Sequence, residues 1–361
     1  MPGFLTGLTP EELEALVKTH GEAAYRARQI TQRVFKQFAW TWEELTDLSA
    51  GLRQRLSEEM PVHGLEEQHL QVSADGTVKG LFKLTDGKTV EAALMPYRER
   101  GGPGRATVCV SSQVGCNIRC PFCATGQQGF ARNLSAGEIV DQVLYFARYL
   151  KDGRAGQGGP AKITNVVFMG MGEPLANYDE VMKAVRILNT PDQFGLGARN
   201  ITISTSGLAP QIRQLGHEPL QVGLAVSLHA GTDGVRNELV PLNRTYPLGE
   251  LMAACRDYFK SSGRRVSFEY VLFKGVNDAP KEARALAQRL KGMNCHVNLI
   301  PANATADSAY QPPEPEAVAA FMAELRSHHI TTTVRQSRGG DIDAGCGQLR
   351  SRLEGRGKGN D

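Results

Sequence analysis

Short apolar runs rich in β-branched residues recur through the middle of the chain and alternate with segments of helical periodicity. The runs are 106–112, 163–170, 200–207, 222–230, 266–273 and 297–303. The helical segment "LSAGEIVDQVLYFARYL" opens on a capping box of Ser135 and Glu138 and carries one apolar face. Strands alternating with helices predict parallel βαβ units, and about six such units suit a barrel-like sheet. We therefore expect an α/β fold with a partial (β/α)6 TIM-like barrel over residues 105–349.

The two ends of the chain differ from this pattern. Residues 1–60 have helical periodicity, with Thr9, Pro10 and Glu12 in the positions of a helix N-terminus. Residues 61–104 contain Asp-Gly pairs between alternating apolar positions, which predict a β-hairpin extension and a linker. Residues 350–361 are polar, and we expect a flexible C-terminal tail. The expected domains are therefore a helical accessory domain, a hairpin extension and the barrel.

Composition and charge narrow the class of protein without identifying it. The 361 residues are 41% hydrophobic, and no apolar run approaches the roughly 20 residues of a membrane span. The first residues lack the apolar segment of a secretory signal, so we expect a cytoplasmic protein with no membrane partner. We further expect it to act as a monomer. A net charge of +3 is too small to indicate nucleic-acid binding by itself, so such an argument depends on local clusters.

Basic residues gather in "YRARQITQRVFKQF" without an acidic residue between them. This segment is interpreted either as part of an RNA-contact module or as a solvated helix whose aromatic residues belong to the core. Residues 1–60 hold seven basic and nine acidic residues, which favours neither a strongly basic domain nor an acidic one. The candidate phosphate contacts are Arg26, Arg28, Arg33 and Lys36, together with Arg98, Arg100 and Arg105 near the linker.

Polar residues recur where the predicted parallel strands end. In parallel barrels, ligands bind at the carboxyl ends of the strands and in the loops that follow. Here those ends read "SS" before a cysteine-rich loop, then "GMGEP", "STSG", "SLH" and "PAN". The sequence therefore predicts one site formed jointly by several strand ends.

Three of the seven cysteines, Cys116, Cys120 and Cys123, lie within eight positions of the loop after the first strand. An odd number of cysteines argues against a disulfide framework, and thiolates bind soft metals. A structural zinc site needs four closed ligands, and the nearest downstream histidine is His217. A thioredoxin-type pair of Cys120 and Cys123 leaves Cys116 without a role. A [4Fe–4S] cluster held by three cysteines leaves one iron open to a small molecule.

The CxxxCxxC spacing after the first barrel strand resembles the radical S-adenosylmethionine (SAM) superfamily. In that superfamily the amine and carboxylate of SAM bind the open iron, and one electron from the cluster cleaves SAM to a deoxyadenosyl radical. Further stretches are similar to the RlmN family of adenine methyltransferases. They are "SSQVGC", "CATGQQGFARNL", "TNVVFMGMGEPLAN", "STSG", "SLHA", "EYVLFKGVND", "NLIPAN" and "RGGDIDAGCGQL", between about residues 91 and 349.

This resemblance implies a role for each matching residue. Cys116, Cys120 and Cys123 would hold the cluster. The SAM-binding positions would be Gly172, Glu173, Ser204, Ser227, Leu228, His229 and Asn303, with Glu173 meeting the SAM ammonium through a charge-assisted hydrogen bond. Taken alone, "GEP" is also a common turn and His229 is equally a core histidine.

The family resemblance also gives functions to two cysteines outside the motif. Cys346 would accept a methyl group from one SAM molecule, and a radical from a second SAM would activate that methyl group. The activated carbon adds to adenine, Cys109 removes the ring proton, and a Cys109–Cys346 disulfide resolves the adduct. Glu91 matches a position described as a proton acceptor; by itself it is a solvated strand carboxylate. Cys255 and Cys295 are expected to be buried as small apolar residues.

The implied function is methylation of adenine carbon 2 in 23S rRNA and beside the anticodon of tRNA, with an external, flavodoxin-like electron donor. The target base has to leave its stack to reach a barrel interior. Three alternatives stay open at this point: methylation at adenine carbon 8, a radical-SAM activase acting on a partner protein, and an RNA-binding protein with a structural metal.

Overall fold

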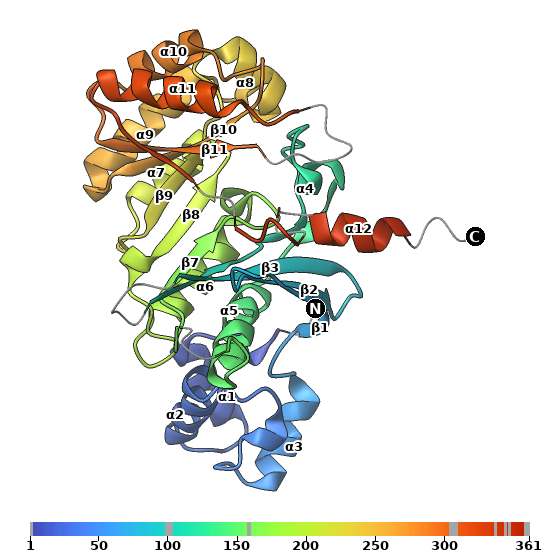
Figure 1. Cartoon of the computed structure of the whole chain (residues 1–361). Coiled ribbons are helices and arrows are strands. Elements are labelled where there is room, and N and C mark those ends of the chain that lie inside the picture. Colours follow the sequence, from blue (N-terminus) through green and yellow to red (C-terminus); the bar gives the residue numbers. More distant parts are fainter. Residues whose placement is uncertain are drawn as a thin grey trace.

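A single mixed sheet runs through most of the molecule and positions the predicted site. The computed structural model describes residues 3–97, 104–156, 160–302, 310–335, 338–342, 345 and 348–356. Within these residues, ten strands form one sheet in the order β1-β2-β3-β4-β7-β8-β9-β10-β11-β12 (Figure 1). Because its two outer strands are not paired with each other, the sheet is an open barrel.

The barrel half of the sheet is parallel throughout. Six of its strands match the apolar runs in the sequence and confirm the predicted βαβ units, whereas the seventh, β12, was not predicted. The parallel strands are β4 (Arg105–Cys109), β7 (Asn165–Phe168), β8 (Ile201–Thr205), β9 (Gly223–Ser227), β10 (Val266–Leu272), β11 (Cys295–Pro301) and β12 (Thr331–Val334).

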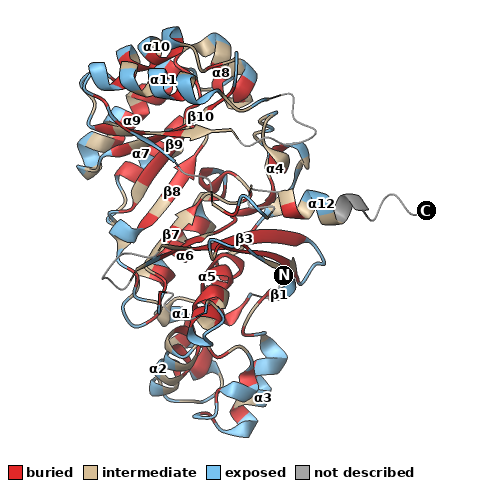
Figure 2. Cartoon of the chain, viewed as in Figure 1, coloured by how far each residue is buried: buried red, intermediate tan, exposed pale blue. Residues whose placement is uncertain are grey.

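Helices lie between these strands along the chain and cover the outer face of the sheet (Figure 1). They are α5 (Ala136–Lys151), α6 (Tyr178–Asn189), α7 (Ala209–Gly216), α8 (Asp233–Leu239), α9 (Leu248–Ser262), α10 (Pro280–Leu290) and α11 (Pro315–Ser327). The capping box predicted for α5 is present, because Ser135 and Glu138 bond to each other's backbone N–H. Figure 2 shows buried central strands and exposed outer faces on α10 and α11.

The hairpin extension continues the barrel sheet. Strands β1 (Leu65–Val72), β2 (Val78–Leu84) and β3 (Thr89–Tyr97) pair antiparallel in sequence, and β3 also pairs antiparallel with β4. In this register Ala93 lies opposite Cys109. The extension therefore brings its own side chains next to the first barrel strand.

The N-terminal segment is helical, as predicted. It contains η1 (Leu5–Gly7), α1 (Pro10–Thr19), α2 (Tyr25–Thr31), the π-helix η2 (Gln32–Lys36), η3 (Trp42–Glu44) and α3 (Ala50–Glu59). Thr9 and Glu12 form the expected capping box of α1. A buried contact attaches this domain to the barrel: His63 Nδ1 lies 2.6 Å from Asp141 Oδ1 on α5, and Trp40 stacks on the His63 ring at 3.7 Å.

Shorter elements complete the described chain. They are β5 (Gln113–Gly115), α4 (Ala124–Gln127), β6 (Phe130–Asn133), η4 (Pro174–Asn177), η5 (Ala198–Asn200), η6 (Pro241–Arg244) and α12 (Gln348–Arg356). Helix α12 includes residues 350–356 of the expected flexible tail, and Leu349 in its first turn is fully buried; residues 357–361 lie outside the described residues. None of the described helices has the length and apolar character that a membrane crossing requires.

Candidate active site

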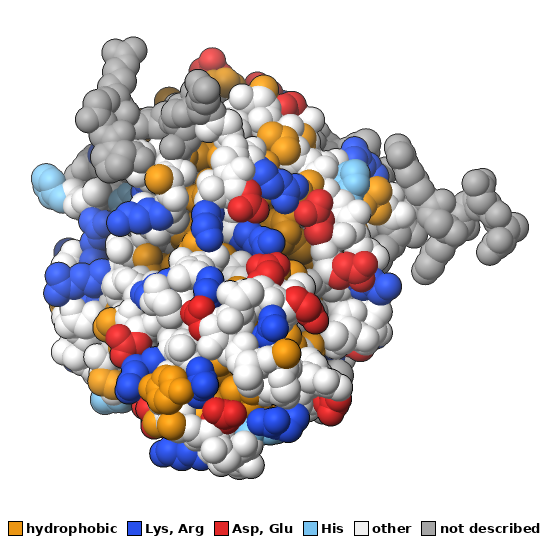
Figure 3. Space-filling model, turned by 90° about the horizontal axis from the view of Figure 1, so that it is seen from below, with side chains coloured by type: hydrophobic (Ala, Val, Ile, Leu, Met, Phe, Trp, Pro, Cys, Tyr) orange, Lys and Arg blue, Asp and Glu red, His pale blue; other side chains and the backbone are white. Residues whose placement is uncertain are grey.

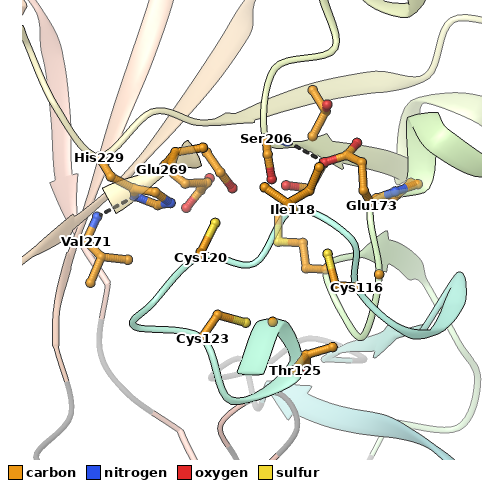
Figure 4. Close-up of a pocket in the computed structure, with 18 of the residues that line it drawn as sticks. Cys116, Ile118, Cys120, Cys123, Thr125, Glu173, Ser206, His229, Glu269 and Val271 are labelled. Atoms are coloured by element: carbon orange, nitrogen blue, oxygen red, sulfur yellow. Dashed lines mark hydrogen bonds between the residues drawn. The ribbon is translucent and has the colours of Figure 1, made fainter. Parts of the chain in front are cut away.

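A cavity of about 290 Å³ opens at the carboxyl ends of the parallel strands. Its walls come from the cysteine loop after β4 and from the ends of β7, β8, β9 and β10 (Figure 4). The predicted site residues that line it are Cys116, Cys120, Cys123, Gly172, Glu173, Ser204, Ser227 and His229. We call it the first cavity.

The three motif cysteines lie on one loop and surround a common space (Figure 4). The loop is closed by Cys116 N–H donating to Gly129 O at 2.8 Å and Cys123 N–H donating to Cys120 O at 3.1 Å. Gly115 turns with φ +79°, and a Cβ there would lie 1.9 Å from Gly129 O. Only glycine fits this position without moving the backbone.

The chemistry of these thiols fits a soft, multinuclear metal centre. Burial raises the pKa of Cys116 to about 12, and burial also raises the pKa of Cys120, with the neighbouring thiols adding to the effect. Thiols crowded in this way ionise readily only when a cation offsets their charge. Among the described residues, no three Cys, His, Asp or Glu side chains converge on a single ion position. In a [4Fe–4S] cluster the three thiolates bind different irons, which suits ligands placed around a shared space.

Glu173 is a buried carboxylate held in a fixed orientation beside this space. Its two carboxylate oxygens accept hydrogen bonds from the backbone N–H groups of Ser206, at 2.6 Å, and Leu175, at 3.1 Å. Burial raises the pKa of Glu173 even though these hydrogen bonds favour the charged form. Gly172 precedes it with φ +102°, where a Cβ would meet the Gln113 side chain at 2.6 Å. The position therefore presents an oriented carboxylate that a bound cation would stabilise.

His229 follows β9 in a left-handed conformation, with φ +59°. Its Nδ1 accepts a hydrogen bond from Val271 N–H at 3.0 Å, so the neutral ring carries its proton on Nε2. Burial, together with the charge of Arg236, lowers the pKa of His229 to about 3. His229 is thus both a buried histidine and a lining residue of the first cavity, and it stays neutral at physiological pH.

Two other predicted SAM-binding residues are placed differently. Leu228 is fully buried and is not part of the cavity wall; its N–H donates to Glu269 O at 2.9 Å. Asn303 lies outside the described residues. The sequence analysis gave no role to Glu269, which lines the first cavity, although this residue opens the stretch "EYVLFKGVND".

A second cavity of about 260 Å³ adjoins the first. Both are lined by Met169, Gly170, Ile300 and Arg335. The second cavity contains Cys109 and Glu91, two residues that the resemblance placed in the chemistry. The structure therefore places Cys109 in a cavity that adjoins the first cavity.

Cys109 is a free thiol whose pKa is raised by burial and partly lowered again by Lys79 and Arg335. Glu91 is buried rather than solvated, and its carboxylate lies 2.7 Å from Lys79 Nζ. Cys346 lies outside the described residues, so the expected Cys109–Cys346 disulfide is not tested here; Gly345, which precedes it, lines the second cavity. Cys255 and Cys295 are buried in α9 and β11, as predicted.

Most of the predicted N-terminal basic side chains form ion pairs or hydrogen bonds with other residues of the protein. Arg33 pairs with Asp47 (Nε to Oδ2, 2.8 Å), Arg26 pairs with Glu22 at 3.4 Å, and Lys36 donates to Pro191 O at 2.7 Å. Arg28 is exposed, with no partner among the described residues. Figure 3 shows Lys and Arg side chains interspersed with Asp and Glu on this face. The structure therefore gives little support to a dedicated basic surface on the N-terminal helices.

Near the second cavity, two further arginines stack on Tyr97. Arg105 and Arg338 lie over its ring at 4.1 and 4.0 Å. Arg98 and Arg100 lie outside the described residues. Arg335 is exposed and lines both cavities, with no side-chain hydrogen bond to the rest of the described chain. Arg335 and Arg338 thus line the second cavity, whereas most of the predicted basic residues on the N-terminal helices have partners within the protein.

The sequence analysis also gave no role to Arg236 on α8. Its fully buried guanidinium donates to the carbonyl oxygens of Ser206, Ser227 and Leu228 at 2.7, 3.2 and 3.0 Å. It therefore joins the ends of β8 and β9, which supply walls of the first cavity. The sequence contains no local signal for this role, since it depends on how α8 packs against two strand ends.

Comparison with known proteins gives consistent matches along the chain. Residues 110–287 match the radical SAM superfamily, and residues 4–62 match the N-terminal domain of ribosomal RNA large subunit methyltransferases. The chain is 47% identical to the dual-specificity RNA methyltransferase RlmN of Syntrophobacter fumaroxidans, over 96% of this chain and 98% of that protein. It is also 47% identical to the probable RlmN of Symbiobacterium thermophilum, over 97% of this chain and 92% of that protein.

A solved structure agrees with these matches. The crystal structure of a radical SAM methyltransferase from Sphaerobacter thermophilus superposes with a TM-score of 0.91 and 48% identity, covering 96% of this chain and 99% of that one. The similarity therefore extends through the N-terminal helices, the hairpin extension and the barrel together.

Proposed function

This chain belongs to the RlmN family of radical-SAM RNA methyltransferases, and on that basis we propose that it methylates carbon 2 of an adenine in 23S rRNA and in tRNA beside the anticodon. The observation that carries the proposal is the shared wall between the two cavities. One cavity holds the three motif cysteines, and the other holds Cys109 and the start of the loop to Cys346. The thiol of Cys109 and the three motif cysteines thus line adjoining cavities.

Cys116, Cys120 and Cys123 would hold a [4Fe–4S] cluster through their thiolates. With SAM bound at its open iron, the cluster would supply the single electron that starts radical chemistry. Glu173 would accept a hydrogen bond from the ammonium of SAM, and its two backbone donors fix the carboxylate in advance. Gly172 leaves room for the ligand, and Ser204, Ser227, Leu228, His229 and Asn303 complete the proposed SAM contacts.

Cys109 of the second cavity and Cys346 would act on the RNA base. We propose Cys346 as the thiol that carries the methyl group and Cys109 as the residue whose thiolate takes the ring proton. After losing that proton again, the Cys109 thiolate would attack the Cys346 sulfur. The disulfide forms as the bond from the Cys346 sulfur to the base-linked carbon breaks, and that carbon keeps the electron pair and takes up a proton, which releases the methylated base. Cys109 suits this part because the nearby positive charges of Lys79 and Arg335 favour its thiolate against the effect of burial. Glu91 is proposed as a further proton acceptor beside it.

The RNA contacts in this proposal are Arg335 at the cavities, Arg105, Arg28 on the N-terminal domain, and Arg98 and Arg100, which lie outside the described residues. A base has to be turned out of its stack to reach these walls. The proposal further includes a separate flavodoxin-like protein as electron donor, a monomeric enzyme and a cytoplasmic location. The match of residues 4–62 to an rRNA methyltransferase domain supports RNA, rather than a partner protein, as the substrate.

Nucleoside analysis tests the proposal directly. Anaerobically reconstituted protein is incubated with unmodified 23S rRNA or tRNA, SAM and a reductant, and the RNA is digested and analysed by mass spectrometry. We expect 2-methyladenosine in both RNAs, and none from Cys346→Ala or Cys109→Ala. Methylation at carbon 8 would support the alternative specificity. RNA methylation that continues in Cys346→Ala would contradict the proposed thiol chemistry.

A further inference from the structure

Three neighbouring strands place Lys79, Ala93 and Cys109 in one row across the sheet. Lys79 on β2 lies opposite Ala93 on β3, and Ala93 lies opposite Cys109 on β4. All three line the second cavity. Because Ala93 is small, the long side chain of Lys79 can extend along this face toward its neighbours.

Lys79 forms a buried ion pair with Glu91, two residues before Ala93 on the same strand. Lys79 Nζ lies 2.7 Å from Glu91 Oε2, and the two side chains are 4% and 2% exposed. Burying two charges is costly unless further hydrogen bonds satisfy them, so the remaining contacts of the pair show what it is arranged to hold.

Among the described residues, further contacts of the pair reach the C-terminal segment. Lys79 Nζ donates to Gly345 O at 3.0 Å. Glu91 Oε1 accepts a hydrogen bond from Arg350 N–H, in the first turn of α12, at 2.7 Å. Gly345 and Arg350 bracket Cys346 in the chain, so each charge of the pair holds one flank of the cysteine.

We propose that the Lys79–Glu91 pair is a clamp that holds Gly345 and Arg350, which flank Cys346 in the chain, beside the cavity that contains Cys109. Lys79 is on this view a positioning residue of the methylation reaction, acting through the Gly345 carbonyl and Glu91. The role of the clamp in catalysis depends on the function proposed above for Cys346. The clamp itself is a physical property of the apo chain and can be tested without the reaction.

Additional contacts from the hairpin extension support this assignment. The carboxylate of Asp341 accepts hydrogen bonds from Ser73 Oγ and, at 2.9 Å, from Ala74 N–H. Gly339 N–H donates to Asp75 Oδ2 at 3.1 Å, and Arg338 Nη1 donates to Pro96 O at 2.7 Å. The hairpin extension thus holds the C-terminal segment at several points. The clamp is the point nearest Cys346 and is buried.

Amide hydrogen exchange tests the clamp on the full-length apo chain. Exchange is measured for peptides within 338–353 in the unmodified chain and in Lys79→Met, Lys79→Arg, Glu91→Gln and Lys88→Met. In Lys79→Met and Glu91→Gln we expect exchange of this segment to accelerate at least about tenfold, because each change removes a charge-assisted hydrogen bond and leaves a charged partner buried. Peptides from β8–β10 should exchange at the same rates as in the unmodified chain.

Two variants serve as matched comparisons. Lys79→Arg keeps a donor for both Glu91 and Gly345 O, and we expect its exchange within about threefold of the unmodified rate. Lys88→Met removes an exposed charge from the β2–β3 turn and should change nothing. In the methylation reaction, Lys79→Met should lower kcat with little change in the KM for RNA, and Lys79→Arg should recover most of the loss.

Unchanged exchange over 338–353 in both Lys79→Met and Glu91→Gln overturns the clamp. If Lys79→Met fails to fold, the exchange rates of Glu91→Gln alone test the clamp, because this substitution keeps the size of the side chain and removes only its charge. Equal acceleration throughout the chain in Glu91→Gln would also contradict a local clamp. A chain that passes the exchange test but methylates no RNA would refute the proposed function and leave the clamp standing.

Discussion

The carboxylate of Glu173 accepts a hydrogen bond of 2.6 Å from the backbone N–H of Ser206, which fixes a buried negative charge beside the three motif cysteines. The first residue follows β7 and the second follows β8, so the contact joins the ends of two adjacent strands. The backbone of the protein itself therefore orients this carboxylate beside the motif cysteines, where it can meet a cationic group.

Glu173→Gln is expected to weaken SAM binding by about 10- to 100-fold, which corresponds to one lost charge-assisted hydrogen bond. The glutamine amide would also face one of the two N–H donors. Equilibrium dialysis on cluster-reconstituted protein measures the effect, with Glu218→Gln, outside the first cavity, as control. Because the pKa of Glu173 is raised above 4.5, SAM affinity should fall as the pH falls through that raised value. Full affinity in Glu173→Gln would remove Glu173 from the SAM site.

The neutral state of His229 gives a prediction for stability against pH. Its pKa is lowered from 6.5 to about 3, so the unfolded chain takes up a proton that the folded chain excludes. The stabilisation is complete above 6.5 and is lost as the pH falls from 6.5 toward 3, by about 1.4 kcal/mol per pH unit. His229→Asn, which tolerates the left-handed backbone, should remove this slope from urea-unfolding measurements at pH 5 to 6. Identical slopes in the two proteins would show that His229 titrates normally.

Cys120→Ala and Cys255→Ala separate the cluster ligands from the structural cysteines. Both positions are largely enclosed, but Cys120 lines the first cavity whereas Cys255 is packed inside α9. We expect Cys120→Ala to lose most of the iron and sulfide bound after anaerobic reconstitution, since two thiolates hold a [4Fe–4S] cluster poorly. Cys255→Ala should retain both. Equal iron and sulfide contents in the two variants would argue against the assigned ligands.

Local sequence patterns were sufficient for much of the fold. The capping boxes at Thr9 and Ser135 and the six apolar runs depend on neighbours within a few residues, so the sequence shows them directly. Strand β12 was missed because Thr331–Thr333 has no apolar alternation. Helix α12 was missed because its stretch is almost wholly polar, and burial of Leu349 against the rest of the protein supplies what its composition does not indicate.

The site was predictable where a motif named its residues and not where tertiary packing chose them. The cysteine spacing and "GEP" led to Cys116, Cys120, Cys123 and Glu173. By contrast, Lys79 comes close to Cys109 only through the register of two antiparallel strand pairs. Sequence periodicity gives the face of a strand and not which strand is its neighbour, so such partners appear only in the folded chain.

Arg236 should be needed for the shape of the first cavity. Its guanidinium holds three carbonyl groups at the ends of β8 and β9, and lysine cannot reach all three at once. We expect Arg236→Met to lower the free energy of unfolding by about 3 kcal/mol, and Arg236→Lys by less. In chemical denaturation, a variant of the exposed Lys281, Lys281→Met, should stay within about 0.5 kcal/mol of the unmodified chain. SAM affinity should fall in Arg236→Lys even where the protein is folded; unchanged affinity would limit Arg236 to general stability.

Arg335 is the described cation best placed to meet RNA at the active site, because it lines both cavities and remains exposed. A phosphate contact contributes to affinity in a salt-dependent way through release of counterions. Arg335→Gln should therefore weaken binding of tRNA and reduce the slope of log affinity against log salt concentration by about 1.

Arg33→Gln provides the comparison, since Arg33 already pairs with Asp47 and its loss should alter the stability of the N-terminal domain more than RNA affinity. Filter-binding titrations at several salt concentrations measure both quantities. If Arg335→Gln keeps the original slope while Arg33→Gln reduces it, the RNA backbone lies on the N-terminal helices and not at the cavity mouth.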